Sequence, residues 1–276
     1  MGMTTIRVLG KSATQTGRFS AARRFDVRSG DLQVRIWSPF FWAESNIRRK
    51  RYQTMNVSEA VTTRISTRSF LNTPVGEPEL RRVLETARWS PSGGNLQPWR
   101  VYGLSGGSMT DFKAALAADQ EVNAVGDRTE FPMYPPDLVD PYRARRFKCG
   151  EDLYATINIP REDKGARLAQ MAKNYDFFGA PAAFFFAIDR SMGPGQWAHL
   201  GMFMQTICLV AEEQGLATCM QEFWMLRHQL VRSFFAIPDE LQVYCGMAIG
   251  YADKSHPING LRTERAPVDE FTVFAS

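Results

Sequence analysis

A short run of apolar residues near the middle of the chain constrains the fold more than any other feature. Residues 180–188 contain no polar side chain and include three consecutive phenylalanines at 184–186. The run is far shorter than the ~20 apolar residues of a membrane-spanning helix. An uninterrupted apolar run of this length is typical of a strand buried on both faces of a sheet. We therefore expect a central strand at 182–188 and no membrane-spanning segment.

Helical and strand patterns surround this run. Apolar residues recur at helical spacing between Leu80 and Ala87, which predicts a helix that starts at Glu77. A longer helix is expected at 196–214, because Gly215 is a residue favoured just after a helix. The other expected helices are 58–65, with Ser58 as its N-cap, 111–118, 164–177 and 225–236, and the other expected strands are 100–104, 217–220 and 243–250.

Residues 126–160 are expected to form an excursion or lid. The segment contains five prolines, which break helices, so we expect at most short helices in it. Its aromatic residues Phe131, Tyr134 and Tyr142 could roof a pocket for flat molecules, or could simply pack on the surface. Residues 256–276 are expected to form a polar C-terminal arm with little regular structure.

The first 54 residues differ from the rest in charge. They hold 11 of the 33 Lys and Arg residues but only 3 of the 29 Asp and Glu residues, so the remaining 222 residues are mildly acidic. An acidic body argues against binding of nucleic acid. We interpret the basic segment as an over-long start, with translation from Met55, or as a tail without function. A targeting peptide and a basic interaction arm are the alternatives. Residues 55–276 are expected to form one domain.

Several common chemistries are disfavoured by the sequence. The four cysteines show no CxxC spacing, which argues against a zinc ribbon or a disulfide framework and fits a reducing, cytoplasmic location. The three histidines are isolated, so no metal site is expected. No phosphate-binding glycine loop of the GxGxxG or Walker type is present.

One motif of hydrolases requires separate attention. Residues 103–107 match GxSxG around Ser105, between an expected strand and an expected helix, which is the context of a nucleophile elbow. The alternative is a strand-to-helix turn in which Ser105 or Ser108 caps the helix. We favour the turn, because an elbow lies on a sheet that is already built and no strand is expected before residue 100.

A cluster of cations and hydroxyls points to an anion. Arg64, Ser66 and Arg68 lie within five residues at an expected helix end, and two guanidinium groups beside a hydroxyl suit a phosphate. If the turn stays helical, the two arginines share one face. The loop at 90–95 offers small residues and backbone amides, which can form a nest for an anion or a ring. Paired arginines on a solvated face are the alternative.

These motifs occur in a characteristic order. The pattern Arg-x-Ser-x-Arg at 64–68 is followed by Ser-Pro-Ser-Gly-Gly-Asn-Leu-Gln-Pro-Trp at 90–99, Gly-Leu-Ala-Thr-Cys at 215–219, Gly-Met-Ala-Ile-Gly-Tyr at 246–251 and Arg-Thr-Glu-Arg-Ala-Pro at 262–267. Over residues 56–276 this order resembles the FMN-dependent nitroreductase family. The resemblance implies an α+β fold of three layers, with a central, mainly antiparallel sheet flanked by helices, in a domain-swapped homodimer.

The resemblance also implies positions for the cofactor. The FMN phosphate and ribityl chain would be held by Arg64, Ile65, Ser66, Arg68 and Arg265, with Arg262 as a further candidate. The loop that packs on the flavin of the partner subunit would contribute Pro91, Ser92, Gly93 and Asn95. Backbone amides near flavin N5 would come from Met220, Gln221 and Glu222, where this chain lacks the Pro-x-Glu-Gly stretch of many relatives.

The chemistry implied by the resemblance is a ping-pong hydride transfer. Hydride from NADH or NADPH would pass through flavin N5 to a small aromatic acceptor, a nitroaromatic or a quinone, and no catalytic side chain is named because the cofactor performs the redox step. Reductive dehalogenation and flavin fragmentation are alternatives on the same scaffold. A flavin-binding protein without turnover is an alternative of a different class.

Overall fold

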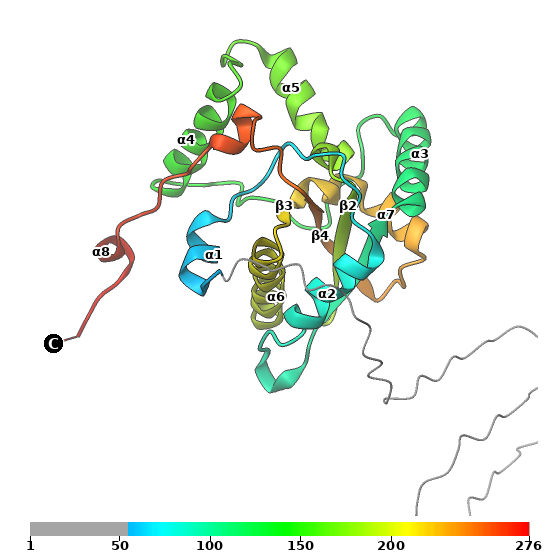
Figure 1. The fold of residues 1–276 in the computed structure, drawn as a ribbon, viewed down its shortest axis with the longest axis horizontal. Coiled ribbons are helices and arrows are strands. Elements are labelled where there is room, and N and C mark those ends of the chain that lie inside the picture. The colour runs from blue at the N-terminus through cyan, green and yellow to red at the C-terminus, as the bar shows by residue number, and fades with distance from the viewer. Residues whose placement is uncertain (1–54, 276) are drawn as a thin grey trace, which may run out of the picture. The chain divides into compact units, whose positions relative to one another are not determined.

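The computed structural model describes residues 55–275 and contains a four-stranded sheet at its centre. The predictions made for residues 1–54 lie outside the described residues. The strand order is β1-β2-β4-β3, and every neighbouring pair is antiparallel. The apolar run forms β2, which is paired on both sides, so the predicted central strand and the mainly antiparallel sheet are confirmed (Figure 1). The strand bounds are Trp99–Ser105 for β1, Ala182–Asp189 for β2, Ala217–Gln221 for β3 and Leu241–Gly250 for β4.

Successive side chains of β2 enter two different cores. Phe184 and Phe186 pack with helices α2 (Glu77–Ala87) and α6 (Pro194–Glu213) on one face of the sheet. Phe185 packs on the other face, with α3 (Gly107–Val122) and α7 (His228–Phe235). Because side chains alternate along a strand, an uninterrupted apolar run requires helices on both faces. The three-layer α+β arrangement implied by the resemblance is therefore present.

Helix α1 differs from the prediction at both ends. It spans Val57–Thr63, and its N-cap is Asn56 rather than Ser58, because the Asn56 side chain accepts a hydrogen bond from the Glu59 amide at 2.9 Å. The helix ends before Arg64, where the backbone turns into an extended conformation. The turn does not stay helical, so Arg64 and Arg68 do not share a helical face, and the segment instead runs as an extended chain alongside β3.

The excursion contains a longer helix than expected. Helix α4 (Tyr142–Ala155) has 14 residues, because none of the five prolines of this segment lies inside it: four precede it, the last at Pro141, and Pro160 follows it. Arg167 of α5 (Lys164–Ala172) makes a two-pronged ion pair with Glu151 of α4, at 2.7 and 2.9 Å. The helix predicted at 164–177 ends earlier, and a 3-10 segment, η2 (Lys173–Gly179), follows it.

The remaining elements are short and lie near the ends of strands and helices. The helix predicted at 225–236 is a 3-10 segment, η3, followed by α7. The C-terminal arm contains two short elements and leaves the body, so that the chain end lies away from the sheet (Figure 1). The short elements are η1 (Gly93–Asn95), η3 (Glu222–Arg227), η4 (Pro257–Gly260) and α8 (Val268–Phe271). Across residues 55–275, no helix combines the length and the hydrophobicity needed to cross a membrane.

Candidate functional site

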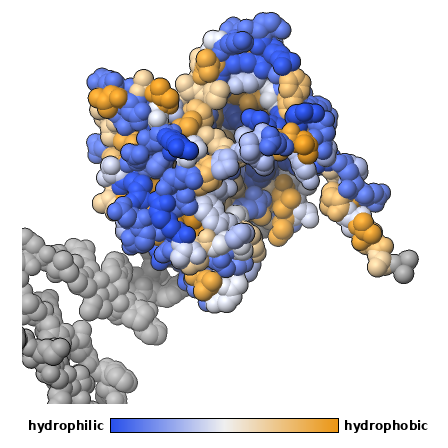
Figure 2. Space-filling model, turned by 180° about the vertical axis from the view of Figure 1, so that it is seen from behind, coloured by the Kyte–Doolittle hydropathy of each residue, from blue (hydrophilic) through white to orange (hydrophobic). Residues whose placement is uncertain are grey.

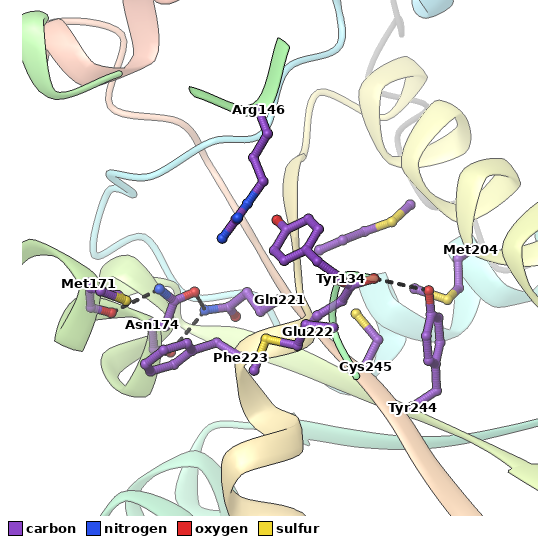
Figure 3. Close-up of a pocket in the computed structure, with 12 residues that line it drawn as sticks. Tyr134, Arg146, Met171, Asn174, Met204, Gln221, Glu222, Phe223, Tyr244 and Cys245 are labelled. Carbon is purple, nitrogen blue, oxygen red and sulfur yellow. Dashed lines mark hydrogen bonds between the residues drawn. The ribbon is translucent and has the colours of Figure 1, made fainter. Parts of the chain in front are cut away.

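A cavity of about 540 Å³ lies where β3 ends and η3 begins (Figure 3). Residues far apart in the sequence surround it. The strands and η3 contribute Met220, Gln221, Glu222, Phe223, Tyr244 and Cys245, α6 contributes Met204, the excursion contributes Met133, Tyr134 and Arg146, and α5 with η2 contributes Met171 and Asn174. The three positions at which the resemblance places backbone amides for flavin N5 therefore border one cavity.

The backbone between β3 and η3 is fixed by a buried glutamine. The amide nitrogen of the Gln221 side chain donates to the backbone carbonyl of Asn174 at 2.9 Å and to its side-chain oxygen at 3.1 Å. The indole nitrogen of Trp224 donates to the side-chain oxygen of Gln221 at 3.4 Å. Because these contacts hold the side chain, they restrict the backbone of residues 220–222 on the cavity wall.

A tyrosine and a glutamate form a second polar feature of the wall. The Tyr244 hydroxyl donates to Oε1 of Glu222 at 3.2 Å (Figure 3). Burial raises the pKa of Tyr244, and the nearby Glu222 carboxylate raises it further, so this hydroxyl stays protonated at neutral pH. Tyr244 and Glu222, with Met133, also line an adjacent cavity of about 530 Å³, whose other lining residues include Phe131 and Trp197.

The Arg-x-Ser-x-Arg segment runs alongside β3. The Thr67 amide donates to the Thr218 carbonyl at 3.0 Å, and Ser66 forms a parallel bridge with Thr218. The Arg68 amide donates to the side-chain oxygen of Asn259 at 2.8 Å, and its guanidinium donates to the Ser66 carbonyl at 3.2 Å. The segment is thus fixed between β3 and the beginning of the C-terminal arm.

The two arginines of this segment lack carboxylate partners. Within the described part of the chain, neither Arg64 nor Arg68 has a carboxylate oxygen within 4.0 Å, and Nε of Arg64 is buried with no hydrogen-bond partner. Burial raises the pKa of the Cys219 thiol in β3 to about 11, and the charges of Arg68 and Arg64 oppose this shift. Two cations therefore lie close to β3 without an anion of the protein to neutralise them, which fits a bound phosphate.

The loop at 90–97 is strained and lies on the surface. Gly94, Asn95 and Gln97 have positive φ angles of 59°, 53° and 48°, and the Ser92 hydroxyl accepts a hydrogen bond from the Gln97 amide at 2.9 Å. The Gly93 amide donates to Nε2 of His199 at 3.4 Å, which attaches the loop to α6. The loop residues Pro91, Ser92, Gly93 and Asn95 border neither cavity of this chain. Strain of this kind collects at functional loops.

The predicted residues of the excursion and of the C-terminal arm lie at several separate places. Tyr134 borders the first cavity and Phe131 the second, whereas Tyr142 is exposed and borders neither. Arg262 and Arg265 are exposed, and in the described residues their guanidinium groups bond only to oxygens of residues 261, 263 and 264. The hydrogen bonds of these two guanidinium groups are therefore all local to the C-terminal arm.

The GxSxG match is a turn in the structure. Ser108 closes it, because its hydroxyl accepts from the Ser105 amide at 3.1 Å and donates to the Ser105 carbonyl at 2.9 Å. Strand β1, which ends at Ser105, is at the edge of the sheet, whereas a nucleophile elbow follows a strand within an established sheet. The interpretation as a helix-starting turn therefore agrees with the geometry.

Comparison with known proteins identifies the family of this fold and site. The model of the Nitroreductase family matches residues 61–251. The chain belongs to the nitroreductase family. Its relatives include a 4-nitrobenzoate reductase of Pseudomonas putida, 34% identical over 80% of this chain and 96% of that protein. A nitrobenzene nitroreductase of Ectopseudomonas oleovorans is 32% identical over 79% of this chain and 96% of that protein.

Solved nitroreductase structures agree with the fold. An FMN- and NADPH-dependent nitroreductase, NfnB of Sphigopyxis sp. strain HMH, has a TM-score of 0.77 and 40% identity, and covers 80% of this chain and 100% of its own. The FMN-dependent NfnB of Mycobacterium smegmatis, solved in complex with NADPH, has a TM-score of 0.74 and 26% identity, and covers 79% of this chain and 97% of its own. The resemblance read from the sequence motifs is confirmed.

Several residues of the site were not predicted from the sequence, among them Tyr244, Asn174, Asn259 and Arg146. Tyr244 could have been identified, since the strand predicted at 243–250 leads from it into the Gly-Met-Ala-Ile-Gly-Tyr motif. Asn174 and Asn259 gave no signal, because each acts through a contact with a segment distant in sequence. Arg146 gave none, because it reaches the cavity from a helix that was not expected in the excursion.

Proposed function

We propose that this protein is an FMN-dependent nitroreductase that uses NADPH to reduce nitroaromatic compounds. The observation that supports it best is the pair of cations without carboxylate partners, Arg64 and Arg68, beside the strand that leads into the cavity. A phosphate at one end of β3 and a ring at the other would match the elongated shape of FMN. The names of the relatives and of the solved neighbours support the same cofactor, donor and substrate class.

The protein's own residues would hold and orient the cofactor. Arg64, Ser66 and Arg68 would bind the phosphate, and Arg64 would gain the hydrogen-bond partner that its buried Nε lacks. The backbone of Met220, Gln221 and Glu222 would face the ring, held in place by the contacts of Gln221 with Asn174. Bound FMN would supply the redox chemistry, accepting a hydride equivalent from NADPH and passing it to the acceptor.

The lining of the cavity suits a flat acceptor. Tyr134 and Phe223 contribute aromatic surface, and Met171 and Met204 contribute flexible apolar surface. A nicotinamide and a nitroarene are both flat, so we propose that they occupy this cavity in turn, which gives ping-pong kinetics. Quinones have the same shape and would be alternative acceptors.

We further propose that the protein is a homodimer whose C-terminal arms exchange between subunits. The arm leaves the body and exposes apolar residues, with Val273 at 96% and Phe274 at 78% of full exposure, and Figure 2 shows hydrophobic residues near its end. Apolar residues on an extended arm are expected to be covered by another surface. The strained loop at 90–97, which borders no cavity of its own chain, would then contact the flavin of the partner.

Steady-state kinetics with NADPH and nitrobenzene test this proposal. Parallel lines in double-reciprocal plots at several nitrobenzene concentrations are expected for the ping-pong cycle, whereas intersecting lines would contradict it. Light scattering after gel filtration should give twice the chain mass of 31.2 kDa. A monomer that keeps full activity would refute the exchange of arms.

A further inference from the structure

One cation of the cavity has no assigned role. Arg146 extends from α4 towards the other residues of the cavity wall (Figure 3). Its guanidinium lies over the ring of Tyr134, with Cζ 4.1 Å from the ring centroid. Such stacking keeps an arginine side chain in one orientation while its N–H groups remain free to donate in the plane of the guanidinium.

The neighbouring cations of α4 differ from Arg146. Arg143 pairs with Asp140 at 2.9 Å, Arg145 pairs with Glu270, and Lys148 pairs with Asp152 at 2.6 Å and with Glu264 at 3.2 Å. Arg146 has no carboxylate oxygen within 4.0 Å among the described residues. Among the cations of α4, Arg146 is therefore the one that borders the cavity and also the one without an ion pair in the described residues.

The polar groups near β3 do not form an ion pair with this cation in the described residues. The carboxylate that borders the cavity is Glu222, which accepts a hydrogen bond from Tyr244. Glu222 is more than 4.0 Å from the guanidinium of Arg146, and methionine side chains line much of the wall. The lining of the cavity thus combines four methionines, polar groups of β3, β4 and η3, and one cation supplied by α4.

We propose that Arg146 selects aromatic acceptors that carry a carboxylate, so that nitrobenzoates are preferred over neutral nitroarenes. The inference rests on the proposed function. The nitro group would lie against the flavin ring that the backbone of residues 220–222 faces, the aromatic ring of the acceptor would lie against Tyr134, and the carboxylate would accept hydrogen bonds from Arg146. The relatives reported above are named for charged and for neutral nitroarenes, so similarity alone does not decide between the two classes.

The test compares 4-nitrobenzoate with its neutral analogue 4-nitrobenzamide, using the FMN-loaded enzyme and NADPH. In Arg146→Ala, the KM for 4-nitrobenzoate should rise about five- to tenfold with little change in kcat, because the contact with the carboxylate is lost equally from the ground state and the transition state. The constants for 4-nitrobenzamide should hold. Arg146→Lys should recover part of the preference, since it keeps the charge but loses the planar stack. Arg143→Ala, which removes a paired cation of the same helix, should leave both substrates unaffected.

Binding without turnover separates this inference from the proposed function. Calorimetry with the unreactive pair 4-chlorobenzoate and 4-chlorobenzamide should show a preference for the anion that Arg146→Ala removes. If that preference is present but neither nitro compound is reduced, the reductase proposal fails and the anion site stands. The inference is overturned if the wild-type enzyme shows no preference for the anion, or if Arg146→Ala impairs the reduction of both nitro compounds equally. It is also overturned if Arg146→Ala raises the KM for NADPH but leaves the KM for NADH and for both nitro compounds unchanged.

Discussion

The backbone amide of Thr67 donates a hydrogen bond to the carbonyl of Thr218 at 3.0 Å. This contact joins the end of the first segment after α1 to β3, the strand that leads into the cavity. It places Arg64 and Arg68 beside β3 without requiring a helical face. The phosphate and ring portions of a flavin would then be held by segments fixed to one another through the backbone.

Replacing Arg68 with alanine should weaken retention of FMN. Loss of a charge-assisted contact to phosphate typically costs about 1.5–3 kcal/mol, so the Kd measured by flavin fluorescence should rise roughly 10- to 100-fold. Arg81→Ala is a matched control, because Arg81 lies on the exposed side of α2 and pairs with Glu77. Equal flavin affinity in Arg68→Ala and the parent would contradict the assigned phosphate site.

Gly246 should not tolerate a side chain. A Cβ at this position would lie 2.3 Å from Cδ1 of Trp224, which is fully buried beneath the cavity wall. Gly246→Ala is expected to lower the free energy of unfolding by about 1–3 kcal/mol in urea denaturation, because the indole must shift in a packed core. Gly107→Ala meets nothing within 4 Å and should change stability little. Similar stabilities of the two variants would contradict the close packing of Trp224 against Gly246.

Arg227 is expected to be important for stability. Its side chain is 2% exposed, and its guanidinium donates to Asp119 at 2.8 Å and to the carbonyls of Asn123 and Ala124. Arg227→Ala leaves a carboxylate and two carbonyls without this partner, so thermal and urea unfolding should show a loss of about 3–5 kcal/mol. Arg88→Ala removes an exposed pair with Glu85 and should cost less than about 1 kcal/mol. An equal cost in both would refute the buried role of Arg227.

The four cysteines should differ in reactivity. Cys149 is exposed, whereas Cys208, Cys219 and Cys245 are buried. Burial raises the pKa of each of these three thiols, so little thiolate is present at pH 8 and access is blocked. Titration with a thiol reagent should modify one cysteine per native chain and four after unfolding. Rapid reaction of a second thiol in the native protein would contradict the described burial.

The same shift predicts a loss of stability at alkaline pH. The pKa of Cys219 rises from an ordinary value near 9 to about 11 in the folded chain, so the folded state retains a proton that the unfolded state releases. The contribution of this thiol to the free energy of unfolding is therefore complete below pH 9 and is lost as the pH rises towards 11. A shift of this size corresponds to a loss of about 2–3 kcal/mol. Cys219→Ala should flatten the decline in unfolding free energy over this range, and Cys149→Ala should not. A decline of equal slope in Cys219→Ala would contradict this account.

Local patterns were sufficient to predict most of the fold. The apolar run that became β2 could pack on two faces, and the glycine at 215 does follow α6. Errors arose where a competing contact decides the structure. Asn56 caps α1, although the Ser58 side chain could also accept an N-cap hydrogen bond. Helix α4 forms between prolines, although a segment rich in proline is expected to lack a long helix. Such outcomes depend on contacts that a composition does not contain.

Most of the candidate site residues predicted from the sequence lie in contiguous motifs, whereas Tyr134 and Phe131 were predicted as aromatic residues of the excursion. Residues 64–68 were identified as a cluster of cations and hydroxyls, and residues 220–222 through the resemblance to the family. The structure aligns the first group with β3 and sets the second on the cavity wall. Arg146 and Asn174 enter the site because α4 and η2 fold back towards β3. Long-range placement of this kind follows from tertiary packing, which no local periodicity encodes.

The visible spectrum of the purified protein, recorded anaerobically before and after NADPH and then a nitroarene, tests the central claim most directly. We expect a flavin spectrum that NADPH bleaches and that 4-nitrobenzoate or nitrobenzene restores. A protein that is colourless as purified and takes up no FMN on reconstitution would contradict the cofactor assignment. A bound flavin that NADPH cannot bleach would contradict the proposed reductase activity.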